Sequence, residues 1–257
     1  MKKIFFLAVA LTIAIISPKQ SYGWGNKGHA MVSEIAFSFL DNGTKARVQK
    51  VLGAMTIEEA GNWMDNLRSD HNYDYMKTWH YLNLDKGAQY VPNTDNNIIN
   101  ALAKAIDALD HKSKLNDSEI KANVLIVFHL VGDMTMPLHV GYGADRGGNT
   151  IQVTYEGHTS NLHRVWDSEI IEREKITTED CLAFYKTMGK EEINENKKIN
   201  VQDWMNEPRA LLDNVYNIPA GNAIDQAYID RNKSIVEQQL VVAGIRLAAV
   251  LQEVFKA

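Results

Sequence analysis

The sequence predicts an all-α (mainly α) protein: a single multi-helix domain with one short β-hairpin near residues 148–156. Apolar residues recur at helical spacing along most of the chain, and polar or glycine-containing turns separate these stretches. Only residues 149–155 alternate β-branched with polar side chains, as a short strand does. No internal repeat or low-complexity tract marks a boundary, so we expect one domain over residues 24–257.

The helical periodicity predicts six helices. We expect them at residues 28–40, 45–55, 57–68, 96–109, 118–130 and 222–255. Asp41-Asn42-Gly43 ends the first helix, and Asp117 or Ser118 begins the fifth. The last stretch is unusually long for one helix, and its polar run from Asp230 to Ser234 predicts a break there.

The first residues have the composition of a targeting segment. Two lysines follow Met1, residues 4–16 are apolar apart from Thr12, and small residues follow Pro18. The apolar run is shorter than the roughly 20 residues that a membrane span needs. We therefore expect residues 1–23 to be a cleaved signal peptide, and the exported chain, periplasmic or secreted, to begin at Trp24. We expect no membrane association after cleavage.

Charge and cysteine content narrow the function classes. The net charge of -5 argues against nucleic-acid binding through a broad basic surface. It leaves open a site whose positive charge comes from bound metal ions. Because Cys181 is the only cysteine, no intrachain disulfide can form. An exported chain of this size must then be held by its core, and by metal where metal binds.

Two segments place a histidine and an aspartate four residues apart: His129 with Asp133, and His163 with Asp167. Four residues are about one helical turn, so on a helix each pair shares one face. Residues 124–128 are all apolar, and a carboxylate close to them is costly to bury unless something positive compensates it. The pattern predicts zinc ligands. The alternative is a structural, hydrogen-bonded His–Asp pair.

Further candidate ligands lie on both sides of these pairs. His139 follows shortly after the first pair, and His80 and Asp65 lie upstream among aromatic residues. His29 stands five residues after the expected mature terminus. The free amino group and carbonyl of Trp24 could chelate a metal together with it, but only once the signal peptide has been removed.

Taken in order, these segments resemble the S1/P1 nuclease family, the zinc-dependent single-strand-specific nucleases that are distant relatives of bacterial zinc phospholipase C. The resemblance covers nearly the whole expected mature chain and extends to Gln238–Ala248. Its motifs are Trp24-Gly-x-x-Gly-His29, Trp63-x-Asp65, Trp79-His80-Tyr81, His129-x-x-Gly-Asp133-x-x-x-Pro-Leu-His139, Gly147-Gly148-Asn149 and Asn161-Leu-His163-x-x-Trp-Asp167.

The resemblance implies three zinc ions with nine ligand residues. The ligands fall into three sets, one for each ion: Asp65, His80, His129 and Asp133; the amino nitrogen and carbonyl oxygen of Trp24 with His29 and Asp133; and His139, His163 and Asp167. Asp133 would bridge the first two ions, and the third ion would keep open positions, as a catalytic zinc does. The other three histidines match no ligand position: His71, His111 and His158.

The family's chemistry implies further roles. Zinc lowers the pKa of a bound water to about 7, and the resulting hydroxide would attack phosphorus. Asp65 and Asp133 hold the metals, and Arg68, three residues after Asp65, would hold the phosphate in the transition state. Tyr81 would stack on a base of a single strand. Asn83 stands where the family has an aspartate, which leaves the base preference open.

Arg146 is a further candidate at the rim of the same pocket. The implied activity is cleavage of single-stranded DNA and RNA to 5′-phosphate products, with 3′-nucleotidase activity, by a monomer that needs no protein partner. The alternatives are a zinc phospholipase C and a non-catalytic zinc-binding exported protein. Trp166-Asp167 disfavours the phospholipase, which would have a glutamate as its last ligand. Fungal and plant relatives use disulfides, so a chain with one cysteine points to a bacterial form.

Overall fold

The structure, a computed structural model, describes residues 24–256; the expected signal peptide, residues 1–23, lies outside them. The predicted mainly-α fold is confirmed, and each expected helix has a counterpart. The six long helices are α1 (Asn26–Phe39), α2 (Asn42–Leu52), α3 (Ile57–Asn66), α4 (Ile98–Asp110), α5 (Asp117–Thr135) and α13 (Gln226–Val254).

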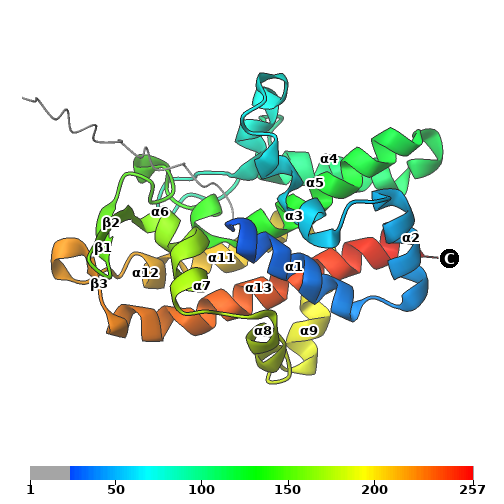
Figure 1. Ribbon diagram of the computed structural model, residues 1–257. Helices are drawn as coiled ribbons and strands as arrows, with labels where there is room; N and C mark the ends of the chain where they lie inside the picture. The colour runs from blue at the N-terminus through cyan, green and yellow to red at the C-terminus, as the bar shows by residue number, and fades with distance from the viewer. Residues whose placement is uncertain (1–23, 257) are drawn as a thin grey trace, which may run out of the picture.

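Helices α5 and α13 form the centre of one continuous hydrophobic core (Figure 1). Every residue from Val124 to Thr135 in α5 is buried, and so is every residue from Gln239 to Ala248 in α13. Helix α1 packs against α13 and α3, while α4 packs against α5. A helix buried on all sides needs little amphipathic periodicity, because every face meets apolar neighbours.

Side-chain caps fix where these helices begin. Asn116 and Glu119 form a capping box at the start of α5, in which each side chain accepts from the other residue's backbone N–H. Asp41 caps α2 by accepting from the backbone of Thr44 at 2.9 Å. The second helix therefore starts at Asn42, three residues before the predicted start, because Asp41 ends one helix and opens the next.

Helix α13 is continuous, so the predicted break between Asp230 and Ser234 is wrong. Asn232 is fully buried in this run, and its side-chain amide donates to the carbonyl of Tyr228 one turn earlier at 2.8 Å. That bond gives the side-chain N–H of Asn232 an acceptor inside an unbroken helix. By length and composition alone α13 could also cross a membrane, but 78% of its apolar window is buried within the fold.

The predicted hairpin is present at one end of the molecule (Figure 1), slightly later than expected. Strands β1 (Gln152–Tyr155) and β2 (His158–Asn161) are antiparallel, with Tyr155 opposite His158. The two turn residues, Glu156 and Gly157, both have positive φ, at 48° and 78°. This is the requirement of a type I′ hairpin turn. A short third strand that was not predicted, β3 (Ala223–Ile224), pairs in parallel with β1.

The remaining elements are short, and the sequence did not predict most of them. They are the 3₁₀ helices η1 (His71–His80), η2 (Lys112–Lys114), η3 (Pro137–Val140), η4 (Gly143–Asp145) and η6 (Ala220–Asn222), the π turn η5 (Val165–Glu169), and α6 (Leu162–Arg164), α7 (Ile170–Arg173), α8 (Thr178–Tyr185), α9 (Lys190–Asn196), α10 (Val201–Trp204), α11 (Asn206–Ala210) and α12 (Leu212–Val215).

A glycine allows α1 and α3 to approach closely. A Cβ at Gly61 would lie 2.5 Å from Ser33 Oγ and 2.7 Å from the carbonyl oxygen of His29. The backbone of α1 cannot yield without moving His29. Gly61 thus fixes the distance between two helices that both carry candidate ligands.

Replacing this glycine is expected to destabilise the fold. Ala normally stabilises a helix interior by up to about 1 kcal/mol relative to Gly. In Gly61→Ala, overpacking against α1 should outweigh this stabilising effect. The free energy of unfolding should fall by about 1–3 kcal/mol. Chemical denaturation measures this. Gly189→Ala is the control, because nothing lies within 4 Å of a Cβ there. Equal stability of the two variants would show that Gly61 is not required for the close approach of α1 and α3.

Candidate metal centre

Helix α5 supplies the two residues around which the centre is built. His129 and Asp133 lie one turn apart on one face, both fully buried, with His129 Nε2 3.2 Å from Asp133 Oδ2. The helix runs on to Thr135, beyond the predicted end at residue 130, so the pair lies within the helix. A carboxylate held there at zero exposure requires positive charge nearby.

One oxygen of Asp133 faces a first group of candidate ligands. His80, at the end of η1, places its Nδ1 2.9 Å from Asp133 Oδ2 and 3.0 Å from His129 Nε2. Asp65, in the last turn of α3, places its Oδ1 3.7 Å from His129 Nε2 and 3.9 Å from His80 Nδ1. These four side chains come from three elements and converge on one point.

The other oxygen of Asp133 faces a second group. His29, from α1, places its Nε2 3.2 Å from Asp133 Oδ1. Trp24 is fully buried beside it, and its indole N–H donates to Thr135 Oγ at 3.2 Å, which holds the start of the described chain against α5. Gly132 leaves the room for this arrangement, because a Cβ there would lie 2.9 Å from His29 Nδ1.

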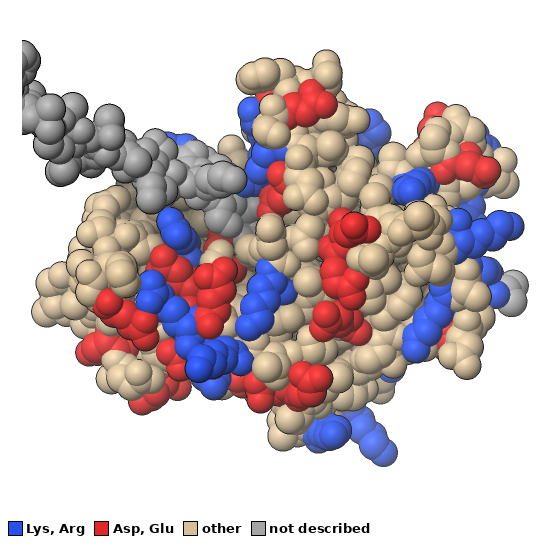
Figure 2. Space-filling view, viewed as in Figure 1, with Lys and Arg blue, Asp and Glu red and all other residues tan. Residues whose placement is uncertain are grey.

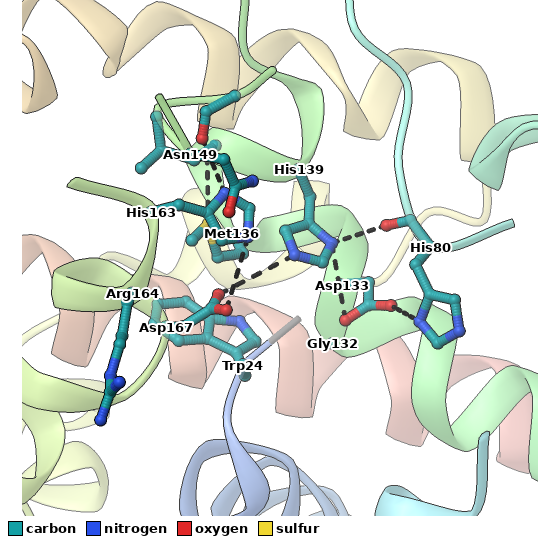
Figure 3. A network of polar contacts seen from close by, with 12 residues as sticks. Trp24, His80, Gly132, Asp133, Met136, His139, Asn149, His163, Arg164 and Asp167 are labelled. Atoms are coloured by element: carbon teal, nitrogen blue, oxygen red, sulfur yellow. Dashed lines mark hydrogen bonds and ion pairs between the residues drawn. The ribbon is translucent and has the colours of Figure 1, made fainter. Parts of the chain in front are cut away.

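A third group lies next to the second. His139 Nε2 is 3.8 Å from Asp167 Oδ1, and His163 Nε2 is 3.4 Å from Asp167 Oδ2. The two imidazole rings stack with their centroids 5.2 Å apart. Figure 3 shows Asp167 facing both histidines, and Asp133 between His139 and His80. His163 and Asp167 are joined through the π turn η5 rather than a regular helix, and such turns are frequent at functional sites.

Backbone carbonyls orient three of the histidines. The Nδ1 of His129 donates to Gly61 O at 2.7 Å, that of His139 to His80 O at 2.6 Å, and that of His163 to Gly147 O at 2.7 Å. A carbonyl can only accept, so each Nδ1 carries the proton and each Nε2 keeps its lone pair for a metal. His129 has one such nitrogen, which lies within reach of His29 and Asp133 as well as of His80 and Asp65. We count it in the first group because its Nε2 is 3.0 Å from His80 Nδ1.

Burial keeps most of these imidazoles neutral. It lowers the pKa of His80 to about 4, of His139 to about 3 and of His163 to about 4. Burial also lowers the pKa of His29, and the neighbouring His129 adds to the effect. Neutral imidazole is the form that binds a metal, so these side chains are held ready for coordination.

In His129 and Asp133, by contrast, the surroundings favour the charged form of the side chain. Burial lowers the pKa of His129, but the carboxylates of Asp133 and Asp65 outweigh it, so its pKa is raised. For Asp133 burial favours the neutral acid, yet His129 and His139 hold its pKa well below the usual range. The centre of the site is thus a carboxylate kept ionised by the groups around it, which is the state in which it could bridge cations.

The donor set fits zinc. Ligand atoms around a tetrahedral zinc with bonds of 2.0–2.1 Å lie roughly 3.3 Å apart, and the closest contacts within the groups run from 2.9 Å to 3.9 Å. Within the described part of the chain, the buried His139 Nε2 makes no hydrogen bond, although it faces a carboxylate oxygen. A cation between the two atoms would give the His139 nitrogen a partner. Imidazole and carboxylate are the ligands that zinc takes in such sites.

A cavity of about 490 Å³ opens beside His163. The predicted residues Arg68, Tyr81, Asn83 and Arg146 all line it. Arg68 lies just beyond the end of α3 rather than within the predicted helix, but it still forms an ion pair with Asp65, with its Nε 2.9 Å from Asp65 Oδ1. The sequence analysis assigned no role to three further lining residues: Lys77, Leu138 and Asn149.

The face of the molecule shown in Figure 2 has no broad basic area, because acidic and basic side chains are interspersed over its described residues. The three histidines without an expected ligand role are exposed and lie apart from the metal centre: His71, His111 and His158.

Arg209 is a residue that the sequence analysis missed. The segment with Tyr81 and Asn83 pairs with the segment after His139, through bonds such as Leu82 N–H to His139 O at 2.8 Å. From α11, Arg209 donates to carbonyls on both segments: Val140 and Gly141 on one, and Asp85 on the other. No local sequence pattern reveals this role, because its partners lie far away in the chain.

Removing the Arg209 guanidinium, which holds the two segments together, is expected to destabilise the protein. Arg209→Gln leaves carbonyls of both segments without their charged donor, which should lower the free energy of unfolding by about 1–3 kcal/mol. Arg231→Gln is the control: Arg231 also donates to two carbonyls, those of Ala227 and Asn217, but at an exposed position. Chemical denaturation measures the free energy of unfolding of both variants. If Arg209→Gln loses no more of it than Arg231→Gln, Arg209 does not hold the two segments together.

The chain matches the family described as S1/P1 Nuclease over residues 24–256. It is 26% identical to Endonuclease 2 of Arabidopsis thaliana over 91% of each chain, and 25% identical to Nuclease P1 of Penicillium citrinum over 90% of this chain and 97% of that one. It is 30% identical to Nuclease S1 of Aspergillus oryzae over 63% of this chain and 59% of that one. With three groups of side chains that could hold metal ions on a mainly helical scaffold, the chain is a nuclease and belongs to the S1/P1 nuclease family, which is zinc-dependent in general.

Proposed function

We propose that this protein is an exported endonuclease with three zinc ions. It hydrolyses phosphodiester bonds of single-stranded DNA and RNA, leaves 5′-phosphate ends and has 3′-nucleotidase activity. The observation that carries the proposal is the position of Asp133, whose two oxygens face two separate groups of ligands. A third group lies beside an open cavity.

The ligand assignment follows the three groups. We assign one ion to Asp65, His80, His129 and Asp133, a second to Trp24, His29 and Asp133, and a third to His139, His163 and Asp167. Bound zinc supplies Lewis acidity, which generates a hydroxide nucleophile near neutral pH and neutralises charge on phosphate oxygens. The third group borders the cavity through His163, so it is the one that substrate can reach.

The chain's own residues bind and orient the substrate. Arg68 is fixed by its ion pair with Asp65, so its guanidinium is positioned between the ligands and the cavity. A planar guanidinium can bind two phosphate oxygens at once, and it stabilises the charge that builds up during transfer. Arg146 offers a second cation from the same cavity wall.

Preference for single strands is assigned to Tyr81 and Asn83. Tyr81 follows the ligand His80 directly and lines the cavity, where an unpaired base can stack on its ring. A paired base in a duplex cannot do so without leaving its stack. Asn83 has both a donor and an acceptor, whereas an aspartate only accepts, so Asn83 can pair with a wider range of base edges.

Export is part of the proposal because of the amino terminus. The family match begins at Trp24, the expected first residue of the mature chain. Trp24 lies buried against α5 and next to His29. Cleavage before Trp24 would provide the amino group that the second zinc ion needs.

The function is tested by digestion. The mature protein should degrade single-stranded DNA and RNA much faster than a duplex, and His163→Ala should abolish this activity while the circular dichroism spectrum stays unchanged. Release of choline from phosphatidylcholine vesicles without nuclease activity would establish the phospholipase instead. Absence of any turnover, with zinc bound, would favour the non-catalytic alternative.

The proposed bridging of two zinc ions by Asp133 makes a separate prediction about metal content. In the mature protein Asp133→Asn should lose more than one zinc ion per molecule, because two groups share that carboxylate, whereas His163→Ala should lose only one. Elemental analysis of purified, dialysed protein measures this. Loss of a single ion from Asp133→Asn would refute the bridge.

A further inference from the structure

The 3₁₀ helix η1 points one lysine at the cavity. It spans ten residues, His71–His80, where runs longer than 3–4 residues are uncommon. With three residues per turn, side chains at i and i+3 lie one above the other. Lys77 is therefore stacked one turn before the candidate ligand His80, roughly 6 Å along the axis. The segment between α3 and α4 that contains η1 projects from the helical body (Figure 1).

Lys77 adds to an unusual charge distribution in the cavity. The lining residues that the structure describes include three cations, Arg68, Lys77 and Arg146, and no carboxylate. The whole chain carries a net charge of -5, so this cluster of positive charge is local. A cavity of this composition, next to a metal centre, attracts more than one phosphate group.

Lys77 is held by a weak, replaceable partner. Its Nζ lies 2.6 Å from Asp74 Oδ1, and both side chains are about half exposed, at 49% and 48%. Asp74 also contacts the exposed His71 at 3.2 Å. Exposed ion pairs of this kind contribute little to stability. A phosphate entering the cavity could therefore replace the Asp74 carboxylate at small cost.

We propose that Lys77 forms a second phosphate subsite, which binds the phosphate next to the scissile one in the substrate strand. Asp74 is its partner when no substrate is bound. The inference rests on the proposed function and deepens it: the preferred substrate carries at least two phosphates. Arg68, paired with the candidate metal ligand Asp65, serves the scissile phosphate. Lys77, one turn before His80 on η1, serves the neighbouring phosphate.

The test compares substrates with one and two phosphates. A dinucleoside monophosphate offers only the scissile phosphate, and a trinucleoside diphosphate of the same base offers a neighbour as well. Lys77→Gln should raise KM for the trinucleotide about tenfold, with kcat unchanged, and leave KM for the dinucleotide as it was. With longer single strands, one lost phosphate contact should reduce the slope of log K against log salt by about 0.7.

Two further variants sharpen this test. Lys86→Gln is the matched control, because Lys86 is an exposed lysine that pairs with Asp213 at 3.4 Å and does not line the cavity. It should leave both KM values unchanged. Asp74→Asn releases Lys77 from its partner and should lower KM for the trinucleotide. That gain should vanish when Lys77→Gln is present in the same chain.

The outcomes distinguish a failure of the Lys77 subsite from a failure of the proposed function. Lys77→Gln with normal zinc content and an equal rise in KM for both substrates would place the lysine at the scissile phosphate and overturn the subsite. So would unchanged kinetics on both substrates. A wild-type protein that cleaves neither substrate nor longer single strands would instead overturn the proposed function.

Discussion

The ionised carboxylate of Asp133, fully buried in the middle of α5, is the constraint on which the rest of the structure depends. Burying such a charge without compensation would cost several kcal/mol. The protein surrounds it with imidazoles from α1, η1, η3 and its own helix. His29 lies in the first turn of α1 and His80 is the last residue of η1, so these two elements begin and end where their histidines meet α5.

The scaffold also uses its own backbone to orient the site. The carbonyls of Gly61, His80 and Gly147 each hold one imidazole through its Nδ1. Two of these carbonyls come from glycines, at places where a Cβ would meet other atoms at under 3 Å. Close approach of the backbone and orientation of the ligands are therefore achieved by the same residues.

The sequence predicted the features that depend on local spacing. The long helices were found because their apolar residues recur with helical period, and the His–Asp pairs because four residues make about one turn. The structure places every predicted metal ligand in or beside the three groups and every predicted substrate residue on one cavity. Assignment of the separate segments to one centre relied on the resemblance to a family, since spacing alone does not bring distant segments together.

Features that neither hydrophobic periodicity nor composition shows were missed or predicted wrongly. Helix α13 continues through its polar run because Asn232 bonds back to Tyr228, a contact that composition does not indicate. The position of Lys77 was not predicted because no helix was expected over residues 71–80, so its place one turn before His80 could not be inferred. The short helices between residues 201 and 215 are fixed by the tertiary fold and are too short to show a period.

His80 takes part in two of the three groups at once. Its side chain lies in the first group, while its backbone oxygen anchors His139 of the third. A shift of this one residue would thus displace ligands in both places. The two groups are mechanically coupled through this one residue, so under the proposed zinc assignment, metal binding at one group would help to shape the other. The affinity for metal at the group beside the cavity would then depend partly on the first group.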